Sequence, residues 1–274
     1  MRIHYREKDN GIEVVRCYGM DGQIVIPDQI DGKPVVSAAP YAFSSRKDRE
    51  EEGTLVYETE ESRLFRQQEI LLAGEDVISV RFPDSVREIG RYIFYGCRNL
   101  SCLSFSDSLM EIGSGAFTGC RNLKKLNVRL CKGPRSCVSE ILGELWQRID
   151  VEFSVEYEEG RERKVSLVFP EHYEEAVENT PARILFTQHH GSGNNYRQCF
   201  YNKEMDYRKY DELFFVAKAQ DQISVLSDLI FDRLMYPEDL TEPAEEEYES
   251  YIREHGADVA ACLTDKENQE ALRE

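Results

Sequence analysis

The stretch VRFPDSVREIGRYIFYGCRNL occupies residues 80–100, and LSFSDSLMEIGSGAFTGCRNL follows at residues 103–123. A third start, LNV, stands at residues 126–128, and every matched position is offset by 23 residues. A fixed period of roughly 20 to 29 residues with aliphatic side chains at fixed places is typical of stacked coils. We therefore expect a short repeat solenoid from about residue 77 to residue 128.

The spacing also predicts which side chains of each coil point inward. One coil cannot bury its own apolar side, whereas stacked coils share a core, and each should contribute a short strand with alternating side chains. The expected inward residues are Val80, Phe82, Leu103, Phe105, Leu126 and Val128. The expected outward residues, which we predict as the interaction face, are Ser79, Arg81, Cys102, Ser104, Lys125 and Asn127. Gly90 and Gly113 stand at a corner where a residue without Cβ is expected.

A weaker copy precedes these two. Ile24–Pro27 is similar to Val80–Pro83 and Pro40–Phe43 to Arg91–Phe94, at offsets of 56 and 51 residues. About five extra residues near Asp31–Lys33 must therefore loop out. Leu64, Phe65, Leu71 and Leu72 follow at helical spacing, so residues 44–76 are expected to hold a degenerate or replaced coil.

The pattern Val-x-Phe-Pro-Asp-Ser-Val-x-x-Ile-Gly-x-x-x-Phe-x-x-Cys-x-x-Leu, from Val80 to Leu100, resembles the BspA-type leucine-rich repeat. The resemblance covers roughly residues 11–130. It implies a solenoid from a family whose many members are bacterial, often surface-exposed, and often concerned with protein or host-surface contact. The expected first domain is residues 1–131.

Beyond Val128 the period ends and other patterns follow. The expected second domain, residues 132–206, is an α+β unit that has a helix capping the solenoid and two hairpins. Helical spacing is found at 136–148 and 171–178, and strand patterns are found at 151–157, 165–169, 182–188 and 196–200, with turns at 158–161 and 191–194. The expected fold class is therefore α+β, with a short leucine-rich-repeat solenoid, a small antiparallel-sheet unit and a C-terminal helical segment.

Residues 207–274 are expected to form that acidic helical segment. Ile223, Leu226, Leu229, Ile230 and Leu234 lie on one helical face that ends before Pro237, and Thr241-Glu-Pro243 opens another helix. The last 38 residues, from Pro237, hold thirteen acidic residues against three basic ones. This surface could dock a basic partner, or it could be only a solvated helix face.

Composition excludes several classes of function. The net charge of -18 argues against nucleic acid as a partner, because phosphate binding needs a cationic surface. The first ten residues are charged where a signal peptide is apolar, and no apolar run reaches the length of a membrane span. We expect a cytoplasmic location, with a surface location as the alternative that the resemblance implies. The eight cysteines are then expected to be reduced.

Three residues of the C-terminal half could carry chemistry. His189, His190 and Cys199 flank the loop Gly191-Ser-Gly193 and could act as base and nucleophile or bind zinc. The alternative is an ordinary packed cysteine, because adjacent strand histidines point to opposite faces. The loop itself lacks the Lys-Ser/Thr ending of a phosphate loop and reads as a hairpin turn.

Two further pairs recur one repeat apart. Cys97 and Cys120 could be bridged across adjacent coils, but a reduced pair in the core is the expectation. Asn99 and Asn122 stand where a side-chain amide can satisfy backbone groups at a bend.

The leading functional hypothesis is a protein–protein interaction module with an unknown protein partner and without catalysis, cofactor, metal, nucleic acid or membrane insertion. The alternatives are a C-terminal enzyme or metal site around His189, His190 and Cys199, and an adhesin-like surface protein.

Overall fold

The computed structural model describes residues 1–46, 53–59, 62–63, 68–156, 162–179 and 184–265, in two compact units. The first unit is Met1–Leu145 with Ser154–Glu162, and the second is Trp146–Phe153 with Arg163–Glu274. The expected turn at 158–161 and the apolar pair Leu64 and Phe65 lie outside the described residues. The predicted domain boundaries after residues 131 and 206 stay a prediction.

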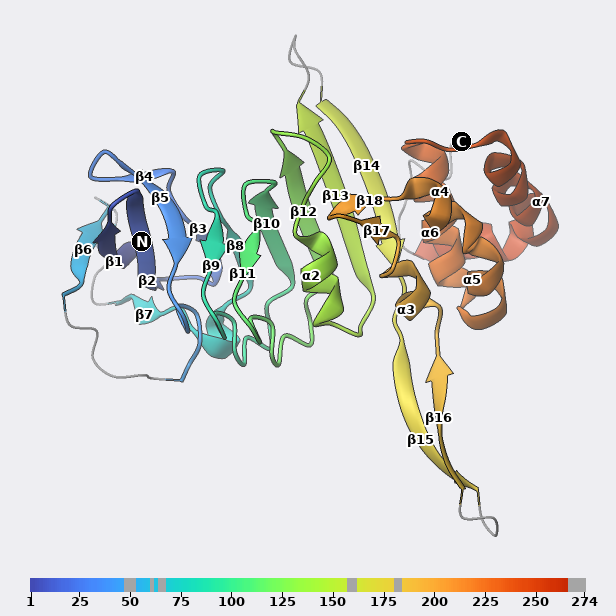
Figure 1. The fold of residues 1–274 in the computed structure, drawn as a ribbon, viewed down its shortest axis with the longest axis horizontal. Helices are drawn as coiled ribbons and strands as arrows, with labels where there is room; N and C mark the ends of the chain where they lie inside the picture. Colours follow the sequence, from blue (N-terminus) through green and yellow to red (C-terminus); the bar gives the residue numbers. More distant parts are fainter. Residues whose placement is uncertain (47–52, 60–61, 64–67, 157–161, 180–183, 266–274) are drawn as a thin grey trace. The chain divides into compact units, whose positions relative to one another are not determined.

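The first unit is mostly β-structure (Figure 1). Its strands are β1 (Arg2–Lys8), β2 (Gly11–Gly19), β3 (Gln23–Val25), β4 (Gln29–Ile30), β5 (Lys33–Ala38), β6 (Leu55–Glu58), β7 (Ile70–Leu71), β8 (Ser79–Arg81), β9 (Glu88–Ile89), β10 (Cys102–Ser106), β11 (Glu111–Ile112) and β12 (Lys125–Leu130). Its helices are the 3-10 turn η2 (Gly74–Asp76) and α2 (Val138–Gly143).

Four of these strands form the repeat sheet, in the order β3, β8, β10, β12, all parallel. Strand β3 is the direct neighbour of β8, with Ile24 beside Val80, so the coils that begin at these strands are consecutive. The segment between them instead adds β6 to β1 and β7 to β2, both antiparallel. Leu71, which sequence spacing placed on a helix, lies in strand β7.

The opposite side of each coil contributes a second set of parallel strands. These are β5, β9 and β11, which pair in this order, and β5 also pairs in parallel with β2. Before this set begins, β4 and β5 form a tight hairpin. Its turn residues Asp31 and Gly32 have φ of 50° and 76°. This hairpin is the place where the sequence offsets predicted that extra residues loop out.

In the core of the coils, side chains from the same position of successive coils stack on one another, and we call the stacked phenylalanines the phenylalanine ladder. Phe43, Phe94 and Phe117 are buried, and their ring centroids are 5.4 and 5.6 Å apart. Gly90 and Gly113 allow the coils to approach, because a Cβ at either residue would lie 2.2 or 2.1 Å from a backbone nitrogen of the preceding coil. Closeness between coils, rather than an unusual backbone angle, therefore explains these two glycines.

The last coil is closed by the segment around α2. Phe43 and Phe94 each donate their backbone N–H to the next coil, to the carbonyls of Ile93 and Ala116. Phe117 has no following coil and donates instead to Glu144 Oε2, at 3.0 Å. The apolar face of α2, expected from helical spacing, is fully buried, so the helix covers the end of the repeat core.

The second unit is α+β. Its strands are β13 (Ile149–Glu156, shared with the first unit), β14 (Glu162–Phe169), β15 (Tyr173–Asn179), β16 (Ile184–His190), β17 (Phe200–Tyr201) and β18 (Glu204–Met205). Its helices are α3 (Gly193–Tyr196), α4 (Tyr207–Glu212), α5 (Phe214–Gln220), α6 (Ile223–Met235) and α7 (Glu242–Asp265). The α+β class predicted from the sequence is confirmed, with a solenoid, small antiparallel sheets and C-terminal helices.

Two local predictions in this unit are wrong. Residues 171–178 were expected to be helical but contain β15, which pairs antiparallel with β16 in a two-stranded ribbon (Figure 1). The predicted hairpin between 182–188 and 196–200 is absent, because Gly193 begins helix α3 and Phe200 pairs with Met205 across a different turn. The predicted strand at 182–188 is confirmed in part as β16, but its partner precedes it in the chain.

Candidate interaction site

The outward side of the repeat sheet is the surface that the sequence analysis predicted as the interaction face. Burial alternates along β8, β10 and β12, so that Val80, Leu103 and Leu126 are buried while their neighbours are exposed or half-buried. We call the outward set the repeat face; it consists of Ser79, Arg81, Cys102, Ser104, Lys125 and Asn127.

Strand register arranges these residues in two rows. Arg81 pairs with Ser104, which pairs with Asn127. Ser79, Cys102 and Lys125 form the parallel row. Because neighbouring strands are roughly 4.8 Å apart, each row places three side chains within about 10 Å. Residues far apart in the chain therefore form one compact surface.

The first row lies in a hollow of about 290 Å³. Its lining residues are Arg81, Phe82, Asp84, Ser104, Phe105, Asn127, Val128, Arg129 and Ser154. The volume lies just below the lower end of the range for small-molecule pockets, and it suits one or a few side chains of a partner.

The polar side chains of the hollow are partly fixed by one another. Asn127 Nδ2 donates to Ser104 Oγ at 3.2 Å and lies 3.3 Å from Cys102 Sγ. At the end of the hollow, Arg129 makes a two-pronged ion pair with Asp84, whose Nε–Oδ1 distance is 3.1 Å. Such a bidentate pair holds both groups in place.

Sequence reasoning missed Asp84 and Arg129. The predicted strand ended at Val128, whereas β12 continues to Leu130 and therefore turns Arg129 outward. The periodicity could have found Arg129, because it stands two residues after Asn127 on the same face. Asp84 follows β8 in a bend and carried no comparable signal.

The repeat region also differs in charge from the rest of the chain, although the net charge of the whole chain does not show this difference. Residues 79–135 hold ten lysines and arginines against four acidic residues, a net charge of +6, whereas the rest of the chain carries -24. The repeat region is thus a basic island in an acidic protein. The argument against nucleic acid rests on the net charge of the whole chain and does not describe this region.

The residues of the alternative catalytic or metal site are not arranged for chemistry. Cys199 is fully buried, its thiol lies 3.8 Å from the Asn195 carbonyl, and burial raises its pKa to about 12. An activated thiolate needs a lowered pKa and access to solvent. His189 and His190 lie instead near carboxylates of β15, with His189 Nδ1 3.3 Å from Glu174 and His190 Nε2 3.3 Å from Glu175. Among the described residues there is no cluster of three His, Cys, Asp or Glu that could hold a metal.

The glycine loop next to these histidines has a structural role. Ser192 is fully buried and hydrogen-bonds to the Asp221 carboxylate through both its hydroxyl and its backbone N–H. Gly193 has no room for a side chain, because a Cβ there would lie 2.0 Å from the Pro170 carbonyl oxygen. The loop is therefore packed against its own unit.

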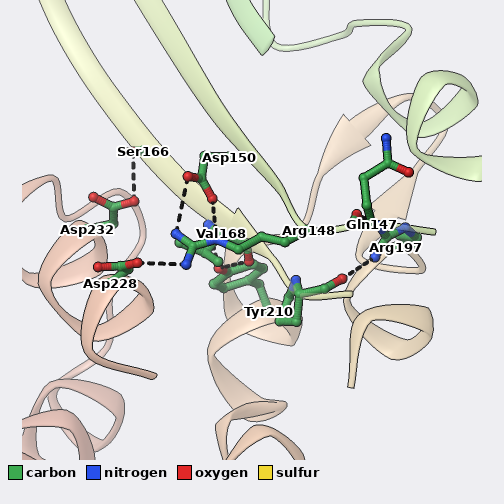
Figure 2. Close-up of polar contacts among 10 residues, drawn as sticks. Gln147, Arg148, Asp150, Ser166, Val168, Arg197, Tyr210, Asp228 and Asp232 are labelled. Atoms are coloured by element: carbon green, nitrogen blue, oxygen red, sulfur yellow. Dashed lines mark hydrogen bonds and ion pairs between the residues drawn. The ribbon is translucent and has the colours of Figure 1, made fainter. Parts of the chain in front are cut away.

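A second group of charged residues lies within the second unit (Figure 2). Arg148 bridges two carboxylates, with Nε 2.8 Å from Asp150 and Nη1 2.7 Å from Asp228. Ser166 donates to Asp232 at 2.8 Å, and burial raises the pKa of that carboxyl to about 6. These contacts join β13 and β14 to α6 and use the polar groups internally, so we interpret them as structural.

The cysteines of the coils are also structural. Cys97 and Cys120 are buried and free, and their thiols lie 3.2 and 3.3 Å from the carbonyls of Phe43 and Phe94 on the preceding coil. Burial raises the pKa of the Cys97 thiol to about 12. Asn99, as predicted for a bend, donates its side-chain amide to the Glu75 carbonyl at 2.8 Å.

Comparison with known proteins identifies the repeats. The family model described as the BspA type leucine rich repeat region (6 copies) matches residues 71–136. No curated protein matches the chain. The matched region is narrower than the 11–130 suggested by resemblance alone, and it leaves out the first coil with its insertion.

Two solved structures are similar to about half of the chain. The T. pallidum leucine rich repeat protein TpLRR is 22% identical, with 48% of this chain and 73% of that chain covered and a TM-score of 0.28. A leucine rich cell surface protein from Faecalibacterium prausnitzii A2-165 is 20% identical, with 46% and 34% covered and a TM-score of 0.30. The present chain thus spans about a third of the second protein. Residues 71–136, which contain strands β8 to β12, are thus similar to a BspA-type leucine-rich repeat region.

Proposed function

We propose that this protein is a protein–protein interaction module that binds a partner protein through the repeat face. The observation that carries the proposal is the in-register row of Arg81, Ser104 and Asn127 along a hollow of about 290 Å³. Stacked coils present such an array of side chains at regular spacing on one face. The leucine-rich repeat family is commonly concerned with protein binding, which supports the same function.

A non-catalytic role fits the chemistry of the described residues. The thiol of Cys199 is buried and has a raised pKa, and the charged cluster around Arg148 is occupied by ion pairs. Binding function, unlike catalysis, needs only a complementary surface.

Site-specific photo-crosslinking tests the proposal. A photoreactive benzoylphenylalanine replaces Ser79 on the repeat face, and in a matched control it replaces Glu111, an exposed residue of β11 on the opposite side of the coil. We expect a discrete crosslinked protein from position 79 and none from position 111 in the native cell. Equal crosslinking from both positions, or none from position 79, would contradict the proposal.

The proposal also includes the location of the protein in the cell. No described helix is both long enough and apolar enough to cross a bilayer. We propose a cytoplasmic location, supported by the eight free cysteines. Cell fractionation tests it, and recovery of the protein at the cell surface, as the family resemblance implies, would overturn it.

A further inference from the structure

The hollow of the repeat face contains one cation without a counter-charge. Arg81 is exposed at the end of β8, and no described residue forms an ion pair or a side-chain hydrogen bond with its guanidinium. The second arginine of the hollow, Arg129, is paired with Asp84. A guanidinium presents five N–H donors in a planar fork that matches a carboxylate. Arg81 is thus the group in the hollow that is available to an anion.

The opposite side of the hollow offers a hydrogen-bond acceptor. Asn127 donates from Nδ2 to Ser104 Oγ, and the same nitrogen lies 3.3 Å from Cys102 Sγ. Asn127 Oδ1 is shielded from solvent and accepts no hydrogen bond from any described residue. Buried polar atoms are nearly always satisfied by protein or water, so this acceptor beside the hollow is available to a donor that a ligand supplies.

Arg81 and Asn127 together define the chemistry of that ligand. They lie two strands apart, roughly 10 Å, which an extended peptide crosses in about three residues. Such a peptide can present a carboxylate to Arg81 and a backbone N–H to Asn127. The outward side of the sheet carries Arg81, Lys125 and Arg129 against Asp84, three positive charges against one negative, which favours an acidic segment.

We propose that the hollow binds an acidic peptide segment of the partner protein, with a carboxylate on Arg81 and an N–H donor on Asn127 Oδ1. This inference rests on the proposed function and names the chemistry of its ligand. The carboxylate can come from an aspartate or glutamate side chain or from a free C-terminus, since both offer the same two oxygens to the guanidinium.

Nuclear magnetic resonance titration of the full chain, labelled with ¹⁵N-asparagine, tests the proposal. The first probe is an acetylated and amidated ten-residue peptide of alternating glutamate and alanine, and the second replaces its glutamates by glutamine. The third is a neutral peptide with a free C-terminal carboxylate. We expect the side-chain amide resonance of Asn127 to shift with the first or third peptide and not with the second. The first and third peptides distinguish a side-chain from a C-terminal carboxylate.

Two charge-matched variants sharpen the test. Arg81→Gln should weaken binding of the glutamate peptide about tenfold, and Arg81→Lys should be intermediate because it keeps the charge but loses the fork. Arg98→Gln removes the same charge from an exposed repeat residue that pairs with Glu75 at 3.2 Å, outside the hollow. It should change the affinity less than about twofold. Thermal melting controls for folding, and we expect both Gln variants to melt like the wild type.

Several results would overturn the inference. Equal losses in Arg81→Gln and Arg98→Gln would indicate diffuse attraction rather than a site. Tighter binding of a single-stranded oligonucleotide than of the glutamate peptide would indicate nucleic acid, and a dimer dissolved by Arg81→Gln would indicate a second copy. If crosslinking from position 79 persists while no peptide shifts Asn127, the interaction face stands and only its acidic ligand fails.

Discussion

The repeat coils and the helices of the second unit differ in whether their charged side chains take part in holding the fold. In the helical part, Arg233 is fully buried and makes a bidentate ion pair with Asp211 at 2.7 and 2.8 Å, and Tyr248 donates to the same carboxylate. In the coils, backbone hydrogen bonds and the phenylalanine ladder hold the fold, and the Arg81 guanidinium pairs with none of the described residues. The comparison teaches that a surface whose side chains do not support the fold is available for binding.

The largest expected effect is on the helical side of this comparison. Asp211→Ala leaves the Arg233 guanidinium buried without a counter-charge, which should lower the free energy of unfolding by about 3–5 kcal/mol. Trp146 is the single tryptophan and belongs to the same unit, so its fluorescence in a urea titration follows this loss.

The exposed Asp258 of α7 supplies the matched control. Asp258→Ala should change the free energy of unfolding by less than about 0.5 kcal/mol. A similar small effect of Asp211→Ala would contradict the view that the helices depend on a buried polar group.

The next effect concerns close packing of the coils. Gly113→Ala places a Cβ 2.1 Å from the backbone nitrogen of Arg91, so the coils must separate, at a cost of roughly 2–3 kcal/mol. Hydrogen–deuterium exchange of peptides from β10 in rising urea measures the change. Gly143→Ala, where a Cβ meets no atom within 4 Å, is the control and should not destabilise the coils. Equal exchange rates in the two variants would argue against the packing explanation.

The smallest effect depends on pH. Burial, reinforced by Asp150 and Asp228, raises the pKa of Asp232 from its ordinary value of 3.8 to about 6, against the hydrogen bond from Ser166 and the charge of Arg148. Between these two pH values the folded state holds a proton that the unfolded state has lost. Stability therefore falls as pH rises from about 4 to 6, and the cost is constant above that window.

Asp232→Asn removes this cost and should raise the free energy of unfolding at pH 7.5 by roughly 1–2 kcal/mol. The gain should shrink toward zero at pH 4, because the wild-type carboxyl is then protonated in both states. Urea titrations at the two pH values, followed by Trp146 fluorescence, provide the comparison. A gain of equal size at both pH values would show that the titration of Asp232 is not the cause.

The coils were predictable from the sequence because their 23-residue period determines which side chains stack on one another and which point outward. The 23-residue offset alone placed Phe94 over Phe117 and turned Arg81, Ser104 and Asn127 outward. It could not give the coil order across the insertion, because the pairing of β3 with β8 depends on where the intervening segment folds.

The strand partners of the second unit were less predictable. The run of β-forming residues at 182–188 identified β16 but not its partner, because strand pairing is a tertiary property and β15 is rich in glutamate. The hollow was likewise invisible to sequence, since the ion pair between Asp84 and Arg129 joins residues 45 positions apart. The repeat period predicts which residues point outward, whereas contacts between residues of different coils determine which of these side chains are paired.

The most direct test of the central claim combines the crosslinking probe at position 79 with the two arginine variants. Crosslinking yield to the partner protein is measured in the full chain carrying Arg81→Gln or Arg98→Gln. If the repeat face binds through the unpaired guanidinium, the yield falls sharply with Arg81→Gln and stays near the wild-type level with Arg98→Gln. An unchanged yield with Arg81→Gln, or an equal fall with both variants, would contradict the account.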